Sequence, residues 1–146
     1  MPVEPDRDQM AEVAALAGAD GDGPVVMLNL NRYRERAAYE GEVPGGESPD
    51  VSGREAYLRY GAVASAVLDR VGGRILWHTD SSGTVIGGDA EVYDEVIAVW
   101  YPSVAAFAAL ATDPETLEAR AHRLAALERA TLIRCVSGAE PELAAA

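Results

Sequence analysis

Two histidines are the side chains of this chain best suited to acid–base chemistry, because a free imidazole titrates near neutral pH. His78 follows Trp77 in a segment expected to be a strand. It could act as a general base, but the favoured alternative is a surface or hydrogen-bonded histidine, since the sequence fixes no partner carboxylate. His122 lies on an expected helix at about 140° from Leu117, counting about 100° per residue, which predicts that it points towards solvent or a partner.

Amide and guanidinium side chains supply the candidates for binding. Asn29 and Asn31 share one face of the first expected strand, and amides among aliphatic neighbours cost free energy unless they are hydrogen-bonded. They could orient a substrate carbonyl, or bond to a second subunit or to Arg134 on the last expected strand. Arg123 flanks the core stripe of its helix, where it could stabilise an anion or bond to a backbone carbonyl. An interface or capping role is the alternative for Arg123.

Aromatic residues could form a platform for a planar ligand. Trp100 and Tyr101 should lie on opposite faces of the third expected strand, so one faces the helices and the other faces away from them. Trp100 could stack on a ring, and Tyr60 on the first long helix could line the rim of a pocket. Filling of the core is the alternative use for both side chains.

Composition excludes several other chemistries. The chain has 146 residues and a net charge of −12, and its 12 basic residues are all arginine, so no lysine is present for a Schiff base. Acidity disfavours nucleic acid and anionic membranes as partners. Neither metal-ligand spacing nor a dinucleotide fingerprint occurs, so no metal and no cofactor are expected. The start of the chain lacks signal-peptide features, and with a single cysteine this predicts a cytoplasmic protein.

The order of the expected elements is strand, helix, strand, strand, helix, strand. This order predicts an α+β, ferredoxin-like fold, with a four-stranded antiparallel sheet and two helices on one face, preceded by an N-terminal helix over residues 6–18. A linker precedes the domain, which spans 24–137, and 138–146 form a flexible tail. The loop 41–53 is either a lid or disordered. Strands are expected at 25–33, 74–79, 95–101 and 131–136, and the long helices at 53–71 and 113–129, with a shorter helix capped by Ser103.

The second face of such a sheet is too apolar to remain in water. It should carry alternate residues of the first strand, either Met27, Asn29 and Asn31 or Val26, Leu28 and Leu30. Pairing of two sheets across a two-fold axis would cover that face, so burial alone predicts a homodimer.

Short motifs recur in order along residues 24–137: Met27-Leu28-Asn29-Leu30, Tyr60-Gly61, Gly72-Gly73-Arg74, Tyr101-Pro102-Ser103, Asp113-Pro114 and His122-Arg123. Their order and spacing resemble the domain-of-unknown-function thirteen-thirty family of the dimeric α/β-barrel superfamily. The resemblance implies a ferredoxin-like fold paired into a barrel dimer, and it implies no known activity. Other members of the superfamily include cofactor-free oxygenases, lactone isomerases and haem-handling proteins, and the fold does not select among them.

These observations support one main hypothesis and two alternatives. The main hypothesis is a small-molecule enzyme without an organic cofactor, which carries out proton transfer, isomerisation, cyclisation or oxygenation on a small apolar or aromatic metabolite. His78 and Arg123 would be catalytic, and the substrate would be bound by Asn29, Asn31, Tyr60, Trp100 and Arg134. The alternatives are a metabolite-binding or stress-responsive dimeric protein without catalysis, and a purely structural dimeric module.

Overall fold

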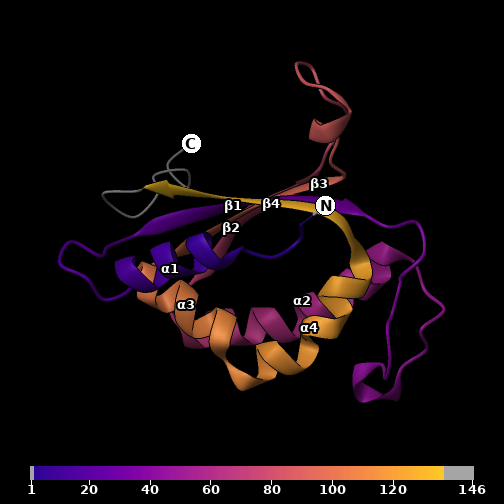
Figure 1. Cartoon of the computed structure of the whole chain (residues 1–146), viewed down its shortest axis with the longest axis horizontal. Helices are drawn as coiled ribbons and strands as arrows, with labels where there is room; N and C mark the ends of the chain where they lie inside the picture. The colour runs from indigo at the N-terminus through magenta and orange to yellow at the C-terminus, as the bar shows by residue number, and fades with distance from the viewer. Residues whose placement is uncertain (1, 137–146) are drawn as a thin grey trace.

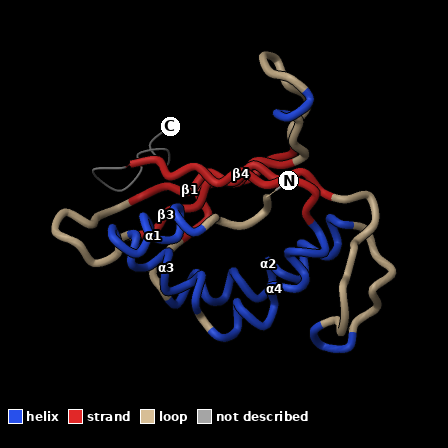
Figure 2. Tube along the Cα trace, in the orientation of Figure 1, coloured by secondary structure: helices blue, strands red, loops and turns tan. Residues whose placement is uncertain are grey.

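The structure of the chain is a computed structural model that describes residues 2–136; the predicted tail at 138–146 lies outside the described residues. One layer of strands lies over one layer of helices (Figure 2). The sheet has the strand order β2-β3-β1-β4, and all neighbouring strands are antiparallel. The elements are α1 (Arg7–Leu16), β1 (Val25–Tyr33), η1 (Pro44–Gly46), α2 (Gly53–Arg70), β2 (Arg74–Asp80), η2 (Asp89–Glu91), β3 (Glu95–Tyr101), α3 (Val104–Thr112), α4 (Pro114–Ala126) and β4 (Leu127–Val136).

The predicted α+β, ferredoxin-like fold is confirmed, and its helices begin where the capping residues indicated. Ser52 accepts a hydrogen bond from the backbone N–H of Glu55 at 3.0 Å, at the start of α2. Ser103 and Asp113 cap α3 and α4 in the same way. The last helix was predicted to run to residue 129, but α4 ends at Ala126. The chain becomes extended at Leu127 because that residue pairs with Tyr33 of β1 and is buried there.

The two faces of the sheet differ in what covers them. The four α-helices lie on one face, as Figure 1 shows, and the short η2 lies on the other side in the connection between β2 and β3. Alternate residues of β1 from Val25 to Asn31 point to this helix-covered face, where Val25, Met27, Val99 and Tyr101 form the core with α2 and α3. The opposite face, called here the outer face, carries Val26, Leu28 and Leu30 in β1. No described helix covers the outer face.

Strand β2 contains one extra residue relative to β3. Ile75 pairs with Val99 and Trp77 pairs with Ala98, so Leu76 has no partner and forms a bulge. After the bulge, Trp77 faces outward and His78 faces the helices, opposite Ile97.

Two long connections leave the sheet at the same end. The loop 34–52 bends towards α2 and α4 and includes η1. The segment 81–94 connects β2 to β3 and projects from the sheet on the side opposite the helices (Figure 1). Among residues 2–136, no helix is long and apolar enough to cross a membrane.

Candidate functional site

The structure brings together four of the predicted site residues and separates the other three. Asn31 and His78 face the helices near the same end of the sheet, and Tyr60 and Arg123 reach towards this region from α2 and α4. Asn29 lies one pair further along β1, and its Nδ2 donates to the carbonyls of Met27 and Ile97, both at 3.3 Å. The amide nitrogen of Asn29 is therefore held by backbone carbonyls of its own chain.

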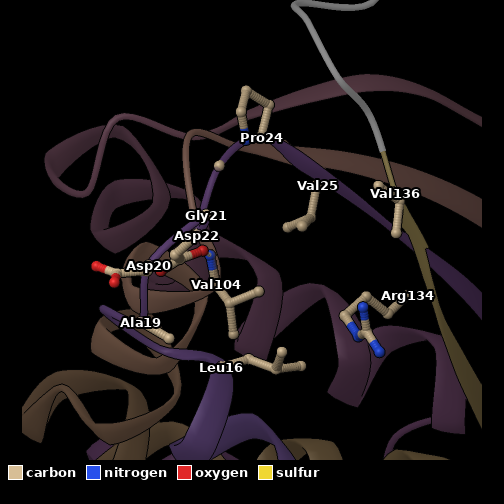
Figure 3. A pocket seen from close by; sticks show the side chains of 11 residues that line it. Leu16, Ala19, Asp20, Gly21, Asp22, Pro24, Val25, Val104, Arg134 and Val136 are labelled. Carbon is tan, nitrogen blue, oxygen red and sulfur yellow. Dashed lines mark hydrogen bonds between the residues drawn. The ribbon is translucent and has the colours of Figure 1, made fainter.

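Trp100 and Arg134 lie outside this region. Trp100 is on the outer face, where the guanidinium of Arg74 lies 5.3 Å from its ring centroid. Arg134 lies near the far end of β4 and pairs with Glu12 of α1 at 3.3 Å. There it lines a cavity of about 310 Å³ together with Leu16, Val25 and Val136, into which Figure 3 shows its side chain pointing.

A largely buried carboxylate, Glu95, occupies the centre of the site. It begins β3 and pairs directly with Asn31 of β1. Its Oε1 accepts a hydrogen bond from the hydroxyl of Tyr33, and its Oε2 lies 3.5 Å from Nδ1 of His78. The guanidinium of Arg54 approaches the same oxygen at 4.0 Å and lies over the Tyr33 ring. Three neighbouring strands thus place His78, Glu95 and Asn31 side by side, and Glu95 supplies the carboxylate that the sequence could not identify.

A row of phenol rings from β1 and α2 covers Glu95 and Asn31. The ring centroids of Tyr33 and Tyr57 are 5.3 Å apart, and those of Tyr57 and Tyr60 are 5.6 Å apart. Burial raises the pKa of each of these three hydroxyls, and the adjacent Glu95 carboxylate raises the pKa of Tyr33 further. The phenols are therefore neutral across the physiological range, so they act as hydrogen-bond donors and not as bases.

Asn31 is the least satisfied polar group of the site. Its side chain is only 2% exposed, and it lies close enough to Tyr33 and Tyr57 to lower the pKa of both hydroxyls. Its Nδ2 nevertheless has no acceptor at hydrogen-bond geometry among the described residues. A buried amide without an acceptor costs about 1–3 kcal/mol, so a bound oxygen atom would relieve this cost.

Arg123 supplies the positive charge on the helix side of the site. Its charge lowers the pKa of Tyr57 and Tyr60, which places the guanidinium near both phenols. Its Nη1 donates to the carbonyl of Val3 at 2.5 Å. The sequence had left open whether Arg123 reaches a ligand or a backbone carbonyl, and the structure shows the second contact. We call Asn31, Glu95, Tyr57, Tyr60 and Arg123, with the flanking His78 and Tyr33, the polar cluster.

The polar cluster combines the groups that proton transfer requires. The carboxylate of Glu95 on the Nδ1 side of His78 favours the tautomer that carries its proton on Nδ1, which leaves Nε2 to accept a proton. The Asn31 amide, the neutral phenols and Arg123 are donors suited to an oxyanion. No group of three or more His, Cys, Asp or Glu residues within residues 2–136 has the geometry to hold a metal ion.

Sequence reasoning missed Glu95 and Tyr33 of the polar cluster and the neighbouring Arg54. Glu95 appeared only as the start of an expected strand, Tyr33 as the end of one, and Arg54 as a residue in the first turn of an expected helix. A possible signal was that Asn31 lies near the end of one expected strand and Glu95 at the start of another, so that the two could be neighbours on the helix-covered face. That signal becomes specific only once the register between β1 and β3 is known.

Of the two directions predicted for His122, solvent is wrong, and the side chain has a partner inside the molecule. His122 is 4% exposed, and its Nδ1 lies 2.6 Å from the hydroxyl of Tyr39 in the loop 34–52. The buried face of α4 is formed by Thr116, Ala119 and His122, while Leu117, used to define the core stripe, is 52% exposed. Small side chains allow α4 to pack closely on α2, and this packing determines which face of α4 is buried.

The loop 41–53 lies against α2 and α4, and its Val51 packs on the same hydrophobic cluster as Tyr33 and Tyr57. Its residues Pro44, Gly45 and Glu47 border a groove of about 510 Å³ that also contacts α2 and α4. Arg59 holds the loop there through Glu47 at 3.0 Å and the carbonyl of Ser48 at 2.7 Å.

Comparisons with solved structures agree with this fold. A protein of unknown function from Rhodopseudomonas palustris is 37% identical, with a TM-score of 0.78 over 95% of this chain and 98% of that one. A hydroxynitrile lyase from Passiflora edulis is 14% identical, with a TM-score of 0.52 over 82% of this chain and 99% of that one. A dimeric ferredoxin-like protein of unknown function from Jannaschia sp. CCS1 is 13% identical, with a TM-score of 0.51 over 79% and 100%. No curated protein matches the sequence of this chain.

The family resemblance noted in the sequence is confirmed. A match to Domain of unknown function (DUF1330) covers residues 47–138, which includes β2, β3, β4 and the long helices. This match covers more than half of the chain, and the Rhodopseudomonas palustris protein is 37% identical over 95% of it. The chain belongs to the DUF1330 family.

Proposed function

We propose that the chain is a small-molecule enzyme that works without an organic cofactor, by proton transfer at the polar cluster. The observation that carries the proposal is the contact of Glu95 with both His78 and Tyr33, beside the unpartnered amide of Asn31. A carboxylate that orients an imidazole is a recurring arrangement for a general base. Most buried polar groups in folded proteins have a hydrogen-bond partner, so the unpartnered Asn31 amide distinguishes this cluster from a purely structural ion pair.

In the proposed reaction, Nε2 of His78 accepts a proton from an acidic C–H or O–H bond of the substrate. The electron pair that remains is delocalised onto a substrate oxygen, which the Asn31 amide and the Arg123 guanidinium stabilise. Isomerisation, cyclisation, elimination and direct reaction with oxygen can each begin from such an anion. The phenol rings of Tyr57 and Tyr60 favour a small apolar or aromatic substrate.

The test is a turnover and proton-exchange assay on a panel of a cyanohydrin, a 1,3-diketone and a hydroquinone, which share an acidic proton beside an oxygen. We expect the protein to accelerate exchange or turnover of at least one compound. His78→Ala and Glu95→Gln should each reduce that rate by about 10²-fold or more, which is the usual range for loss of a general base. Thr79→Ala is the matched control. Thr79 is also an exposed residue of β2, but its side chain points to the outer face, whereas that of His78 points to the helices.

Two results would contradict the proposal. One is an absence of exchange or turnover above buffer for the whole panel. The other is a rate that both variants leave unchanged. Saturable binding of a panel compound without turnover, detected as a shift of the Asn31 side-chain amide in an NMR spectrum, would instead indicate a metabolite-binding protein without catalysis.

We also propose that the chain forms a homodimer through the outer face of its sheet. Support comes from the apolar character of that face, where Trp77 and Ile133 are exposed alongside Val26, Leu28 and Leu30. The fold is shared with a protein from Jannaschia sp. that is described as dimeric. Sedimentation equilibrium should show a dimer at micromolar concentration, and a monomer at all accessible concentrations would contradict the proposal.

A further inference from the structure

The segment 81–94 is the one long connection that leaves the sheet on the outer side (Figure 1). We call it the arm. Its length exceeds that of most hairpin connections, and long connections in compact domains usually have a function or are disordered. The arm has an ordered set of internal hydrogen bonds, which favours the first explanation.

Internal contacts give the arm a defined shape. The hydroxyl of Thr84 donates to the carbonyl of Glu91 at 2.9 Å, and the backbone N–H of Gly88 donates to the carboxylate of Glu91 at 2.9 Å. Gly87 adopts a φ of 152°, and a Cβ at this position would press on Thr84 and Glu91. The arm is therefore folded back on itself, and its tip is presented in a fixed conformation.

The base of the arm is fixed above the outer face. The hydroxyl of Tyr93 lies 2.6 Å from Oγ1 of Thr131 in β4, so the Tyr93 side chain reaches across β1. The guanidinium of Arg32 donates to the carbonyl of Asp89 at 3.5 Å. These contacts fix the base of the arm on its own sheet, and Figure 1 shows the rest of the arm projecting away from that sheet.

The tip consists of two aliphatic residues in full contact with solvent. Val85 is 98% exposed and Ile86 is 94% exposed, more than any other large apolar residue that the structure describes. Isolated exposed aliphatic side chains are common, but two adjacent ones at the end of an ordered projection form a contact element without a partner.

We propose that the arm is a dimer clasp, in which the tip residues Val85 and Ile86 pack on a second copy of this chain. This inference rests on the homodimer proposed above. A second copy is the favoured occupant because the arm projects to the same side as the apolar outer face, so a copy seated there lies beside the tip. Two-fold symmetry makes the contact reciprocal, so each dimer contains two clasps.

Charge supports the same occupant. The arm carries the acidic residues Asp89 and Glu91, both exposed. Arg129 lies on the outer face opposite Arg32, and no ion pair with another residue in the range 2–136 engages it. Acidic arms and an arginine on the face they approach give the complementarity that a self-association surface needs.

The experiment compares the double variant Val85→Ser/Ile86→Ser with wild type by sedimentation equilibrium. Four aliphatic side chains per dimer lose their burial, so we expect the dimer Kd to rise by at least about 100-fold. The matched control is Leu58→Ser/Leu117→Ser, which changes two aliphatic residues that are 67% and 52% exposed on the helix side of the molecule. The control should leave the Kd within about threefold of wild type.

The possible outcomes separate the clasp from the dimer. A wild-type chain that is monomeric overturns both proposals. A wild-type dimer whose Kd is the same in the arm variant overturns the clasp and leaves the dimer standing. An equal rise in Kd for the arm and control variants also overturns the clasp, because the effect would then not depend on the tip. Unchanged far-UV circular dichroism of the arm variant shows that its fold is intact.

Discussion

Replacing Tyr39 by phenylalanine tests how much one partly buried side-chain hydrogen bond contributes to holding the loop 34–52 against α4, beside the backbone bonds of Arg34 and Ala38 to that helix. The Tyr39 hydroxyl lies 2.6 Å from Nδ1 of His122, and the two rings meet edge to face with centroids 5.6 Å apart. Phenylalanine keeps the ring contact, so the substitution removes only the hydroxyl. Arg59, which donates to the same hydroxyl at 3.3 Å, retains Ser48 and Glu47 as partners. The main loss is therefore the partner of the buried Nδ1 atom.

A buried polar atom without its partner costs about 1–3 kcal/mol, so the free energy of unfolding should fall by that amount. The assay is urea unfolding at fixed protein concentration, because association would otherwise contribute to the apparent stability. Tyr101→Phe is the control, because Tyr101 is also buried but its hydroxyl makes no hydrogen bond with any residue in the described part of the chain. A loss below about 0.5 kcal/mol for Tyr39→Phe, or an equal loss for Tyr101→Phe, would refute the reasoning.

The same histidine gives the stability a defined pH dependence. Burial lowers the pKa of His122 below its usual value of 6.5, and Arg59 lowers it further against the opposing effect of Glu47. The unfolded chain then binds more protons than the folded chain, so this contribution is present above pH 6.5 and is lost as the pH falls towards the lowered value. Urea unfolding between pH 7 and pH 5 should show this loss for wild type and a smaller loss for His122→Gln.

Three further predictions concern other parts of the fold. A Cβ at Gly53 would collide with two backbone carbonyl oxygens, so Gly53→Ala should lose at least about 2 kcal/mol in urea unfolding, whereas Gly61→Ala, with open space around it in the same helix, should gain about 0.5–1 kcal/mol. The buried hydroxyl of Thr116 has no partner in residues 2–136, so Thr116→Val should be neutral or stabilising by up to about 1 kcal/mol, and a loss above about 1 kcal/mol would contradict this. The backbone N–H groups of residues 18, 104 and 105 lower the pKa of Asp22 below 3.8, so its contribution is present above that pH and disappears as the pH falls through the lowered value; Asp22→Asn should remove this part of the acid dependence of the thermal midpoint.

The sequence predicted the architecture well because the fold depends on local patterns. Alternation in β1 correctly placed Asn29 and Asn31 on one face, and the opposite orientations of Trp100 and Tyr101 followed from the same rule. Capping residues marked the helix starts to within a residue. These features are determined by neighbours close in the chain, so a single sequence contains them.

The site was less predictable because it depends on contacts between distant residues. Glu95 becomes a partner of His78 only through the register of β2 on β3, and a Tyr33 hydroxyl reaches it only through the register of β3 on β1. His122 was misplaced for a different reason. Its helix was oriented by its large aliphatic residues, whereas the face packed against α2 consists of His122 and small side chains such as Ala119 and Ala125.

The bulge at Leu76 controls the identity of the side chain that faces Glu95 from β2. If Leu76 were paired and no bulge formed, alternation from Ile75 would turn Trp77 towards the helices and His78 towards the outer face. Deletion of Leu76 would, by contrast, leave Ile75, Trp77 and His78 opposite Val99, Ala98 and Ile97, so the imidazole would stay at the polar cluster. Among family members, a histidine at this position therefore faces the helices either where the extra residue is bulged out or where it is missing, and a residue that is inserted but paired would turn the histidine to the outer face.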